Sequence, residues 1–389
     1  MIEMRRRVQP AIGDRDSCGC KPRKSERRQM TDYEGRRSSL LALVEGDGFL
    51  VVNIEGSDGV SMFYLTGFTG EGALLLTNEE AVLLTDSRYT EQAAREVPRL
   101  AVEEVKGDYL EAVTKAVKKR NCETISYASR RFSHYGATKL QELLGKKLDT
   151  PEDPILELRI IKDREEISHI KDATRLTEES LEELLKQIKV GMRERDLALK
   201  LEMIMRRKGA QKVAFDLIVA SGKNSALPHY QPGDRAIEEG DLLLFDIGAR
   251  LDGYCSDMTR VFAVKKATQQ GQDIYELVRR ANEAGLNALK PGAKGLDVDR
   301  LARDVIDEGG HTEHFGHGLG HGVGLEVHEA PRLSQLSKDT LKEGMVVTVE
   351  PGVYLPEFGG VRIEDLATIT EHGAEVLTNI PKDRLRTVG

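Results

Sequence analysis

The sequence predicts two domains of mixed α/β (α+β) structure, a small α/β domain over residues 30–152 and a larger domain over residues 153–389. Three observations lead to this prediction. Short apolar runs alternate with helix-forming stretches through the first half of the chain. Two prolines among acidic residues at 149–154 indicate a boundary. The second half combines β-prone segments with acidic, histidine and glycine residues, and 389 residues are enough to bury more than one core.

The first domain is expected to alternate strands and helices. The expected elements are a strand at 49–53, a hairpin of strands at 73–77 and 81–85, a helix at 88–97, a strand at 100–105, a helix at 108–120, a strand at 124–128 and a helix at 134–146. None of the connecting segments is a glycine-rich loop of the kind that cradles phosphate. The first domain therefore carries no evident chemistry of its own.

The second domain opens with helical sequence. Residues 163–188 are amphipathic and rich in helix formers, and a second helix is expected at 193–208. The charged face of the second helix is most simply a solvated surface. This helix leads into the apolar run 213–220.

Two apolar, β-prone runs flank an Asp-Gly turn signal at 252–253 and predict a hairpin over residues 241–262. In one register Asp246 and Asp257 pair directly. In the other, with residues 252–253 at the turn, Asp257 opposes Gly248 and lies diagonal to Asp246. Both registers put the carboxylates on one face, where like charges roughly 5 to 8 Å apart destabilise the hairpin unless a cation lies between them. The alternative is a pair of solvated hairpin carboxylates.

A glycine-rich segment over residues 314–329 contains three of the nine histidines within twelve positions, His317, His321 and His328. Each interior glycine would cost a helix roughly 1 kcal/mol, so this segment is predicted to be extended or looped. His317 and His321 are an even number of residues apart and therefore share one side of an extended chain. The glycines leave room for a substrate or an ion to approach the backbone. A lone histidine is more often structural, but this grouping favours a functional site.

Two further acids lie in β-rich sequence near the C-terminus. Residues 345–354 form an apolar strand that carries Glu350 to its end, where Pro-Gly breaks it. Residues 359–370 return as another strand and carry Glu364. An acid in such a run is rarely buried without a partner, and for Glu364 the alternative is a plain salt bridge to Arg362.

Together these segments present five potential metal ligands: Asp246, Asp257, His321, Glu350 and Glu364. Four carboxylates and one imidazole form a hard, oxygen-rich set, which suits Mn²⁺, Co²⁺ or Fe²⁺ and permits Zn²⁺. Four acids carry more negative charge than one divalent ion neutralises. Two divalent metals bridged by shared carboxylates are the simpler electrostatic solution, and they indicate a two-metal hydrolase.

The chain resembles the pita-bread metallopeptidases, and within them the branch of aminopeptidase P and prolidase. The motifs that carry the resemblance are Leu244-Phe-Asp246-Ile-Gly, Tyr254-Cys-Ser-Asp257-Met-Thr-Arg260, His317-Gly-Leu-Gly-His321, Val327-His328-Glu329, Thr348-Val-Glu350-Pro-Gly and Gly360-Val-Arg362-Ile-Glu364-Asp365 in the second half, with Leu227-Pro-His229 upstream, and Tyr64-Leu-Thr-Gly-Phe-Thr-Gly70 and Thr85-Asp-Ser-Arg-Tyr-Thr-Glu-Gln92 in the first half. The resemblance covers the chain from about residue 34 to the C-terminus. It implies a creatinase-like N-terminal domain, a catalytic pita-bread domain and a homodimer.

The resemblance also implies roles for individual residues. Asp246 would bind one metal, Asp257 and Glu364 would bridge both, and His321 and Glu350 would complete the other. A hydroxide between the two metals would attack the scissile carbonyl, with Glu350 as general base. The remaining roles would be substrate contact and oxyanion stabilisation by His328 and His229, and support by His317 and Arg362.

The implied activity is hydrolysis of the Xaa-Pro bond, either at the N-terminus of longer peptides, as in aminopeptidase P, or in dipeptides, as in prolidase. Arg332 bears on this choice, because an arginine at this place holds a dipeptide carboxylate in some prolidases and can grip it bidentately. The alternative for Arg332 is a solvated loop side chain. The alternative for the whole chain is a repurposed protein that binds peptides or hydrolyses a non-peptide amide, although the complete ligand set argues against this.

Composition narrows the remaining choices. A formal net charge of −8 argues against a general nucleic-acid binder, and no apolar run approaches the ~20 residues of a membrane span. Without an apolar secretory core at the N-terminus, the four cysteines favour a reduced, cytoplasmic protein. Residues 1–29 hold nine Lys or Arg against four Asp or Glu and are expected to be a disordered basic tail or a start-site extension. Cys18 and Cys20 in this tail are weak metal-ligand candidates.

Overall fold

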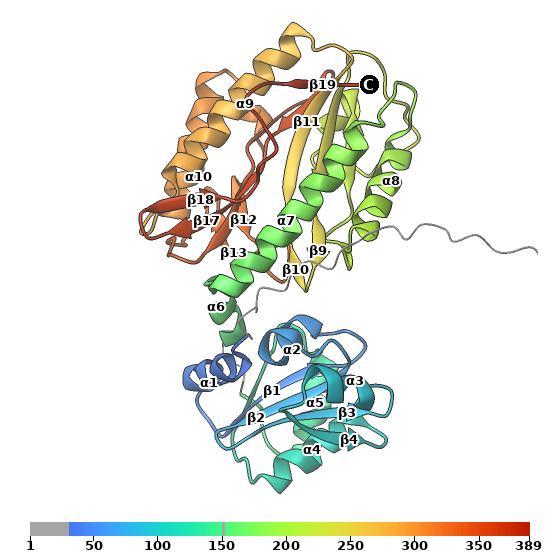
Figure 1. Cartoon of the computed structure of the whole chain (residues 1–389). Coiled ribbons are helices and arrows are strands. Elements are labelled where there is room, and N and C mark those ends of the chain that lie inside the picture. Colours follow the sequence, from blue (N-terminus) through green and yellow to red (C-terminus); the bar gives the residue numbers. More distant parts are fainter. Residues whose placement is uncertain (1–30, 150–151) are drawn as a thin grey trace, which may run out of the picture. The chain divides into compact units, whose positions relative to one another are not determined.

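The computed structural model describes residues 31–149 and 152–389. The expectations for residues 1–29, including Cys18 and Cys20, therefore fall outside the described residues and stay predictions, as does the domain boundary expected after residue 152. The described residues from 32 onwards form one compact unit. Figure 1 gives the labels of the helices and strands.

The first part of the fold is a five-stranded sheet with helices around it. Its elements are α1 (Tyr33–Leu43), β1 (Gly48–Asn53), α2 (Gly59–Thr66), β2 (Gly72–Thr77), β3 (Ala81–Asp86), α3 (Thr90–Glu96), β4 (Ala101–Val105), α4 (Tyr109–Lys119), β5 (Ile125–Tyr127) and α5 (His134–Leu144). The strand order is β4-β3-β2-β1-β5, with β1 antiparallel to β2 and parallel to β5. Every strand and helix expected between residues 49 and 146 is present, and the hairpin of β2 and β3 is confirmed.

Two helices of this part were not predicted. Both begin at an aspartate that caps the first turn: the side chain of Asp32 accepts a hydrogen bond from Gly35 at the start of α1, and that of Asp58 accepts one from Ser61 at the start of α2. Such caps satisfy backbone N–H groups that a helix leaves without partners. Helix α2 ends at Gly67, which adopts a left-handed conformation with φ 81°.

The second part contains five α-helices and two short 3₁₀ turns. They are α6 (Pro154–Ile160), α7 (Arg164–Leu185), α8 (Glu194–Arg207), η1 (Gly222–Ala226), α9 (Gln269–Ala288), α10 (Gly295–Glu308) and η2 (Thr312–His314). The helices expected at 163–188 and 193–208 are confirmed as α7 and α8. Asp163 and Glu166 form a capping box at the start of α7, in which each side chain accepts from the backbone N–H of the other residue.

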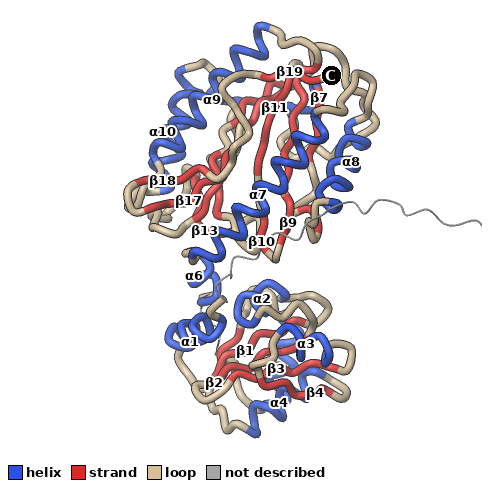
Figure 2. The backbone as a smooth tube through the Cα atoms, viewed as in Figure 1, coloured by secondary structure: helices blue, strands red, loops and turns tan. Residues whose placement is uncertain are grey.

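The strands of this part form four small sheets. They are β6 (Lys212–Val213), β7 (Ile218–Ser221), β8 (Leu242–Ile247), β9 (Ala249–Leu251), β10 (Tyr254–Cys255), β11 (Met258–Val264), β12 (Gly320–Gly322), β13 (Glu329–Leu333), β14 (Val346–Val349), β15 (Gly352–Leu355), β16 (Gly359–Arg362), β17 (Asp365–Thr370), β18 (Gly373–Val376) and β19 (Arg386–Val388). The sheet orders are β10-β9-β6, β19-β11-β8-β7, β13-β12-β14-β17-β18 and β15-β16. Figure 2 shows these strands between the helix pairs α7–α8 and α9–α10.

Strand β8 illustrates how the sequence separates the two faces of its sheet. Leu243 and Phe245 pack with α8 in one buried cluster, whereas Leu242 and Leu244 pack with α9 and α10 in another. Side chains alternate along a strand, so Asp246 projects to the same side as Leu242 and Leu244. A strand that is apolar on both faces therefore delivers one carboxylate to the side on which the site lies.

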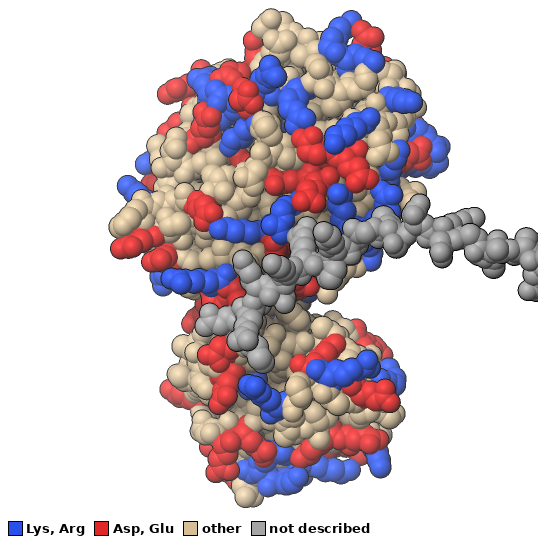
Figure 3. Space-filling view, viewed as in Figure 1, with Lys and Arg blue, Asp and Glu red and all other residues tan. Residues whose placement is uncertain are grey.

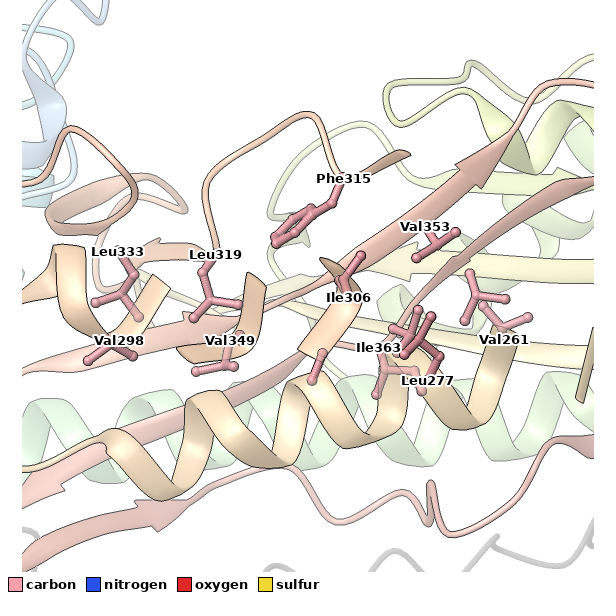
Figure 4. Packing of buried hydrophobic residues seen from close by; sticks show 14 of the residues in the cluster. Val261, Leu277, Val298, Ile306, Phe315, Leu319, Leu333, Val349, Val353 and Ile363 are labelled. Atoms are coloured by element: carbon pink, nitrogen blue, oxygen red, sulfur yellow. The ribbon is translucent and has the colours of Figure 1, made fainter. Parts of the chain in front are cut away.

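The cluster beneath the site joins α9 and α10 to the strands. Figure 4 labels ten of its members: Val261, Leu277, Val298, Ile306, Phe315, Leu319, Leu333, Val349, Val353 and Ile363. Burying each such side chain contributes roughly 1.5 to 3 kcal/mol relative to leaving it in water. Val349 and Ile363 each precede a site acid in sequence, so the core fixes the backbone from which those acids project.

The outer surface is polar. On the face in Figure 3, acidic and basic side chains are intermixed over the described residues. The helices supply pairs such as Arg207 Nη2 and Glu183 Oε1, which lie 2.8 Å apart. Exposed pairs of this kind contribute little to stability. Within residues 31–149 and 152–389, no helix is both long enough and apolar enough to cross a membrane.

Helix α9 supplies a test of local stability. The side chain of Thr268 accepts a hydrogen bond from the backbone N–H of Gly271 at 3.0 Å and caps the helix. Thr268→Ala should lower the free energy of unfolding by about 1 kcal/mol, while Thr268→Ser should stay close to wild type. Denaturant unfolding measures both variants. An unchanged free energy in Thr268→Ala would show that the cap is not needed.

Candidate active site

One pocket of about 570 Å³ gathers the side chains that the sequence singled out. All five predicted metal ligands and all five predicted supporting residues line it: Asp246, Asp257, His321, Glu350, Glu364, His328, His229, His317, Arg332 and Arg362. They come from seven separate segments of the chain. Their roles stay predictions, but their common location is a finding.

The hairpin brings the two aspartates to the pocket in the second of the two expected registers. Asp252 and Gly253 form the turn with φ of 49° and 86°, and Leu251 opposes Tyr254. These paired positive φ values are typical of a two-residue turn with an Asp-Gly sequence. Further along, Ile247 opposes Met258, which leaves Asp257 diagonal to Asp246. Asp257 is 4% exposed, as expected for a residue on the inner side of the sheet.

His321 lies on β12, which pairs with β13 on one side and with β14 on the other. Its Nδ1 lies 3.0 Å from the carbonyl oxygen of Gly322, so Nδ1 carries the proton and donates it. The Nε2 lone pair then faces the acids, with Glu350 Oε1 at 3.4 Å and Asp257 Oδ2 at 3.7 Å. Burial lowers the pKa of His321 to about 3, which keeps the imidazole neutral and able to bind a metal.

Glu350 and Glu364 both follow a strand at the point where its ladder ends. Glu350 comes directly after β14, and its N–H donates to the Leu319 carbonyl at 2.8 Å. The run 359–370, expected as a single strand, is interrupted instead: β16 ends at Arg362 and β17 begins at Asp365. That break was not predicted. It leaves Glu364 outside both strands, where its Oε2 accepts a hydrogen bond from Thr259 at 2.8 Å.

The acids repel one another strongly. One ligand atom each from Asp257, His321 and Glu364 lies within 4.8 Å of the other two. Burial raises the pKa of Asp257 and of Glu364 well above the ordinary carboxyl range, and the neighbouring carboxylates raise them further. Burial also raises the pKa of Glu350, with Asp246 adding to the shift and Arg362 opposing it. Without a cation, the charged cluster is therefore unfavourable.

Arg362 is the cation nearest to these acids. Its Nη2 donates to Asp246 Oδ2 at 2.5 Å, and its Nε donates to Thr259 Oγ1 at 3.1 Å. Thr259 in turn donates to Glu364, so one guanidinium orients two acids that are more than 100 residues apart in the sequence. The salt bridge weighed as an alternative for Glu364 is instead made to Asp246. Arg362 is 3% exposed, and burial favours such a fixed, planar donor.

Tyr354 joins Arg362 to His317 and was not singled out by the sequence. Its hydroxyl accepts from Arg362 Nη1 at 2.7 Å and donates to His317 Nε2 at 2.8 Å. The other ring nitrogen of His317 donates to the Gly318 carbonyl at 2.8 Å. Burial lowers the pKa of His317 to about 4 and raises that of Tyr354 to about 12. Tyr354 was expected only as the last residue of an apolar strand, and a lone tyrosine there carries no signal of a role.

The mouth of the pocket is formed by more exposed side chains. His229, His328 and Arg332 are all exposed, and the ring of His328 lies 4.4 Å, centroid to centroid, from that of His321. The Arg332 backbone N–H donates to Asp339 at 2.7 Å, while its guanidinium makes no hydrogen bond or ion pair within the described part of the chain. The segment 215–218 forms a wall of the pocket. It connects β6 to the start of β7, and these two strands belong to different sheets.

The donor set fits divalent metal ions. Asp246 Oδ1 and Asp257 Oδ1 are buried and have no hydrogen-bond partner within the described residues. Buried carboxylate oxygens are seldom left unpaired, and a bound cation would supply the missing partner. The neutral Nε2 of His321 and the oxygens of Glu350 and Glu364 face the same space. This set of hard oxygens with one imidazole matches the preferences of Mn²⁺, Co²⁺, Fe²⁺ or Zn²⁺.

Comparison with known proteins gives two family matches along the chain. Residues 168–371 match metallopeptidase family M24, and residues 36–161 match the creatinase/prolidase N-terminal domain. A Xaa-Pro dipeptidase from Pyrococcus furiosus is 40% identical over 330 residues, which are 84% of this chain and 93% of that protein. A peptidase of unassigned function from Bacillus subtilis is 39% identical over 87% of this chain and 95% of its own length.

Solved structures give the same picture. The chain resembles an X-Pro aminopeptidase from Thermotoga maritima with a TM-score of 0.86 and 39% identity, covering 90% of this chain and 99% of that one. It also resembles a Xaa-Pro dipeptidase from Bacillus anthracis with a TM-score of 0.87 and 36% identity, covering 92% and 100%.

A creatinase-like domain followed by a pita-bread domain, with an acid-rich pocket in the second, defines a metal-dependent peptidase. The chain belongs to metallopeptidase family M24. The expected family and fold class are thereby confirmed.

Charge repulsion in the pocket predicts how metal affects stability. The pKa values of Asp257, Glu350 and Glu364 are higher in the folded than in the unfolded chain. Their contribution to stability is therefore fully present below the unfolded value of about 4 and is lost as the pH rises through the folded values. Saturating Mn²⁺ should raise the unfolding temperature of metal-stripped protein, and by more at pH 8 than at pH 5.5, because the ligands must be deprotonated.

Scanning calorimetry with and without Mn²⁺ at the two pH values measures this effect. Asp257→Asn serves as the control, because it removes one of the repelling charges and should reduce both the pH dependence and the gain from metal. An equal metal gain at both pH values would contradict the predicted repulsion.

Proposed function

We propose that the protein hydrolyses the Xaa-Pro bond of peptides and holds two divalent metal ions, Mn²⁺ or Co²⁺ with Fe²⁺ or Zn²⁺ as alternatives. The observation that carries this proposal is the convergence of four acids and a neutral imidazole on one pocket, in which two buried carboxylate oxygens have no hydrogen-bond partner among the described residues. Relatives named as Xaa-Pro peptidases support the bond specificity.

In this proposal Asp246, Asp257 and Glu364 hold one metal, and Asp257, Glu364, His321 and Glu350 hold the other. When bound, the ions supply a Lewis acid that polarises the peptide carbonyl and lowers the pKa of water. Arg362 and Thr259 orient the carboxylates by donating to Asp246 and Glu364.

Glu350 is the proposed proton acceptor. Its carboxylate lines the pocket, with Oε1 3.4 Å from His321 Nε2, where it can take a proton from water. Because Glu350 Oε1 also accepts from Thr348 at 3.3 Å, the carboxylate is held in one orientation relative to the pocket. The proton that Glu350 takes from water is then available to the leaving prolyl nitrogen.

His328 and His229 are proposed to contact the substrate. Both are exposed at the pocket mouth, and burial lowers the pKa of His328, so it is neutral near pH 7 and can donate from one ring nitrogen. A donor aimed at the oxygen of a carbonyl under attack stabilises the negative charge that develops there. His317 is fixed by Tyr354 and acts in support.

Proline specificity has a physical reason. The Xaa-Pro bond lacks an N–H, so a peptidase that binds the amide hydrogen of its substrate cannot hold this bond. A site that acts on the carbonyl oxygen does not need that hydrogen. Phe215, Leu217 and Ile218 line the pocket and offer an apolar surface for an uncharged ring.

Substrate length depends on Arg332 in this proposal. Its guanidinium lines the pocket and makes no hydrogen bond or ion pair within the described residues, so it is available to a substrate carboxylate. A dipeptide presents that carboxylate close to the scissile bond. The relatives include both dipeptidases and an aminopeptidase, and we therefore keep cleavage of longer peptides as the second candidate.

The first test compares Ala-Pro with Ala-Pro-Ala as substrates of metal-stripped protein with Mn²⁺ or Co²⁺ restored. Cleavage of both indicates an aminopeptidase P, and cleavage of the dipeptide alone indicates a prolidase. If neither is cleaved although metal is bound, the pocket serves a repurposed protein that binds peptides or hydrolyses another amide.

Glu350→Gln should lower kcat by roughly 10²-fold or more, because it removes the proton acceptor while keeping the size of the side chain. Steady-state kinetics with either peptide measures the loss, and metal analysis separates it from loss of metal binding. Turnover within about threefold of wild type would exclude Glu350 as the base.

Arg332→Ala should weaken dipeptide turnover more than tripeptide turnover, since it removes the partner of a nearby C-terminal carboxylate. The loss should appear mainly in kcat/KM for Ala-Pro and amount to about tenfold or more, the scale of a charge-assisted hydrogen bond. Arg332→Lys keeps the charge without the planar fork and should fall between. An equal loss of turnover on both peptides would instead indicate that Arg332 is a solvated loop side chain without a role in binding the dipeptide carboxylate.

The homodimer and the cytoplasmic location stay predictions. Light scattering of the purified protein at working concentration tests the first, and a monomer mass would remove it.

A further inference from the structure

The loop that carries His328 is held by a buried ion-pair cluster outside the predicted ligand set. Acids flank His328 on both sides in the sequence. Glu326 Oε2 lies 2.9 Å from Arg159 Nη2, and Glu329 Oε2 lies 2.9 Å from Lys162 Nζ. Arg159 Nη2 also contacts Glu329 Oε1, which in addition accepts from the Glu326 backbone N–H at 3.0 Å.

Three of these four charged side chains are almost completely removed from water, whereas the Glu326 side chain is 27% exposed. Arg159 is 2% exposed, Lys162 4% and Glu329 8%. Burial alone raises the pKa of Glu329, but attraction from Lys162 and Arg159 outweighs it and lowers the pKa below the ordinary range. Nε and Nη1 of Arg159 have no hydrogen-bond partner within the described residues. All the side-chain hydrogen bonds of Arg159 there are made by Nη2, to Glu326 and Glu329 of the His328 loop. A cluster this deep fixes the backbone to which it is attached.

The backbone of the loop is shaped around the Glu329 carboxylate. A Cβ at Gly324 would lie 2.7 Å from Glu329 Oε2, so this glycine leaves the space that the carboxylate fills. The ladder between β12 and β13 also shifts here, since His321 opposes Arg332 whereas Gly322 opposes Glu329. The loop between these strands therefore begins and ends at residues whose positions depend on Glu329.

His328 itself has no such anchor. Its ring makes no hydrogen bond within the described residues and is placed by packing against His321 and by its own backbone. A side chain at the pocket mouth that is fixed only through its backbone moves when the neighbouring anchor moves. A displacement of about 1 Å in a group that contacts the substrate can cost about 10²-fold in rate.

We propose that Glu329, clamped between Arg159 and Lys162, is a positioning residue that sets the place of the His328 imidazole over the pocket. This inference rests on the proposed function, because peptide turnover is its readout. Glu329 does not contact the substrate; it acts through His328.

A double-mutant cycle tests this role. Glu329→Gln, His328→Ala and the double variant are compared with wild type on Ala-Pro and Ala-Pro-Ala in saturating Mn²⁺. His328→Ala should lower kcat by about 10²-fold, the scale of a lost oxyanion donor. Glu329→Gln should lower kcat by about tenfold or more and leave KM within about twofold. In the His328→Ala background, Glu329→Gln should cause no further loss beyond about twofold, because residues that act through one another are not additive.

Glu329→Gln leaves two buried cations without a full partner and can fail to fold, so Lys162→Met is the second variant. It removes one cation, keeps an unbranched side chain that is one heavy atom shorter, and leaves Glu329 paired with Arg159. Lys162→Met should lower kcat when His328 is present and should not lower it further when combined with His328→Ala. Lys162→Arg keeps the charge and should recover at least part of the lost kcat.

Glu178→Gln is the matched control. Glu178 is also 8% exposed, its Oε1 accepts the backbone N–H of Ile380 at 3.1 Å, and it does not line the pocket. This control should lower the unfolding temperature and leave kcat within about twofold of wild type, which separates loss of a buried acid in general from loss of Glu329.

The outcomes are distinguishable. If wild type cleaves the peptides and the Glu329→Gln or Lys162→Met loss is the same with and without His328, the positioning role is overturned while the peptidase stands. An unchanged kcat in both variants overturns it as well. If wild type binds Mn²⁺ and cleaves neither peptide, the proposed function fails and the role for His328 falls with it.

Discussion

Mutual repulsion among buried carboxylates is the constraint on which the rest of the second domain depends. Asp257 and Glu364 share a space with His321 in which no described cation lies between them, and burial makes each charge more costly. A fold can keep such a cluster only if its scaffold is rigid without it. The scaffold here consists of strands that are apolar on both faces, packed between two helix pairs, with each acid placed where a ladder ends or turns.

Arginine side chains organise this pocket at two levels. Arg362 contacts the acids directly and connects them through Tyr354 to His317, so the orientation of three functional groups depends on one guanidinium. Arg159 lies behind the His328 loop and has no contact with the acids of the pocket among its hydrogen bonds. The first arrangement orients acids that line the pocket, and the second holds the backbone of the His328 loop.

Much of the fold and of the candidate site could be predicted from the sequence. Apolar alternation located every element expected between residues 49 and 146, and the Asp-Gly turn left two registers, of which the structure has the second. All ten residues chosen from the motifs line one pocket. Their use as ligands or as substrate contacts is still untested, because residue type and location do not by themselves demonstrate chemistry.

The parts that could not be predicted depend on contacts between distant segments. Helix α2 has only eight residues, and the caps of α1 and α2, Asp32 and Asp58, are single residues without a strong periodic signal beside them. Tyr354 acquires its hydrogen bonds only when Arg362 and His317 are brought to it. The break before β17 depends likewise on what Asp365 meets: Arg260 Nη2 at 2.7 Å, Thr378 Oγ1 at 2.6 Å and the ammonium group of Lys382.

That break gives two adjacent acids opposite surroundings. Burial would raise the pKa of Asp365, but Arg260 and Lys382 outweigh it and lower the pKa to about 2, whereas its neighbour Glu364 is pushed in the other direction. A strand that slipped by one residue in one direction would place Glu364 beside Arg260 and Lys382 and Ile363 in the pocket, and a slip in the other direction would place Leu366 beside the two cations and Asp365 in the pocket. Arg260 and Lys382 thus favour the observed register of β17. In that register Asp365 neutralises their charge and Glu364 faces the pocket. The alignment of one strand thus decides which acid faces the pocket.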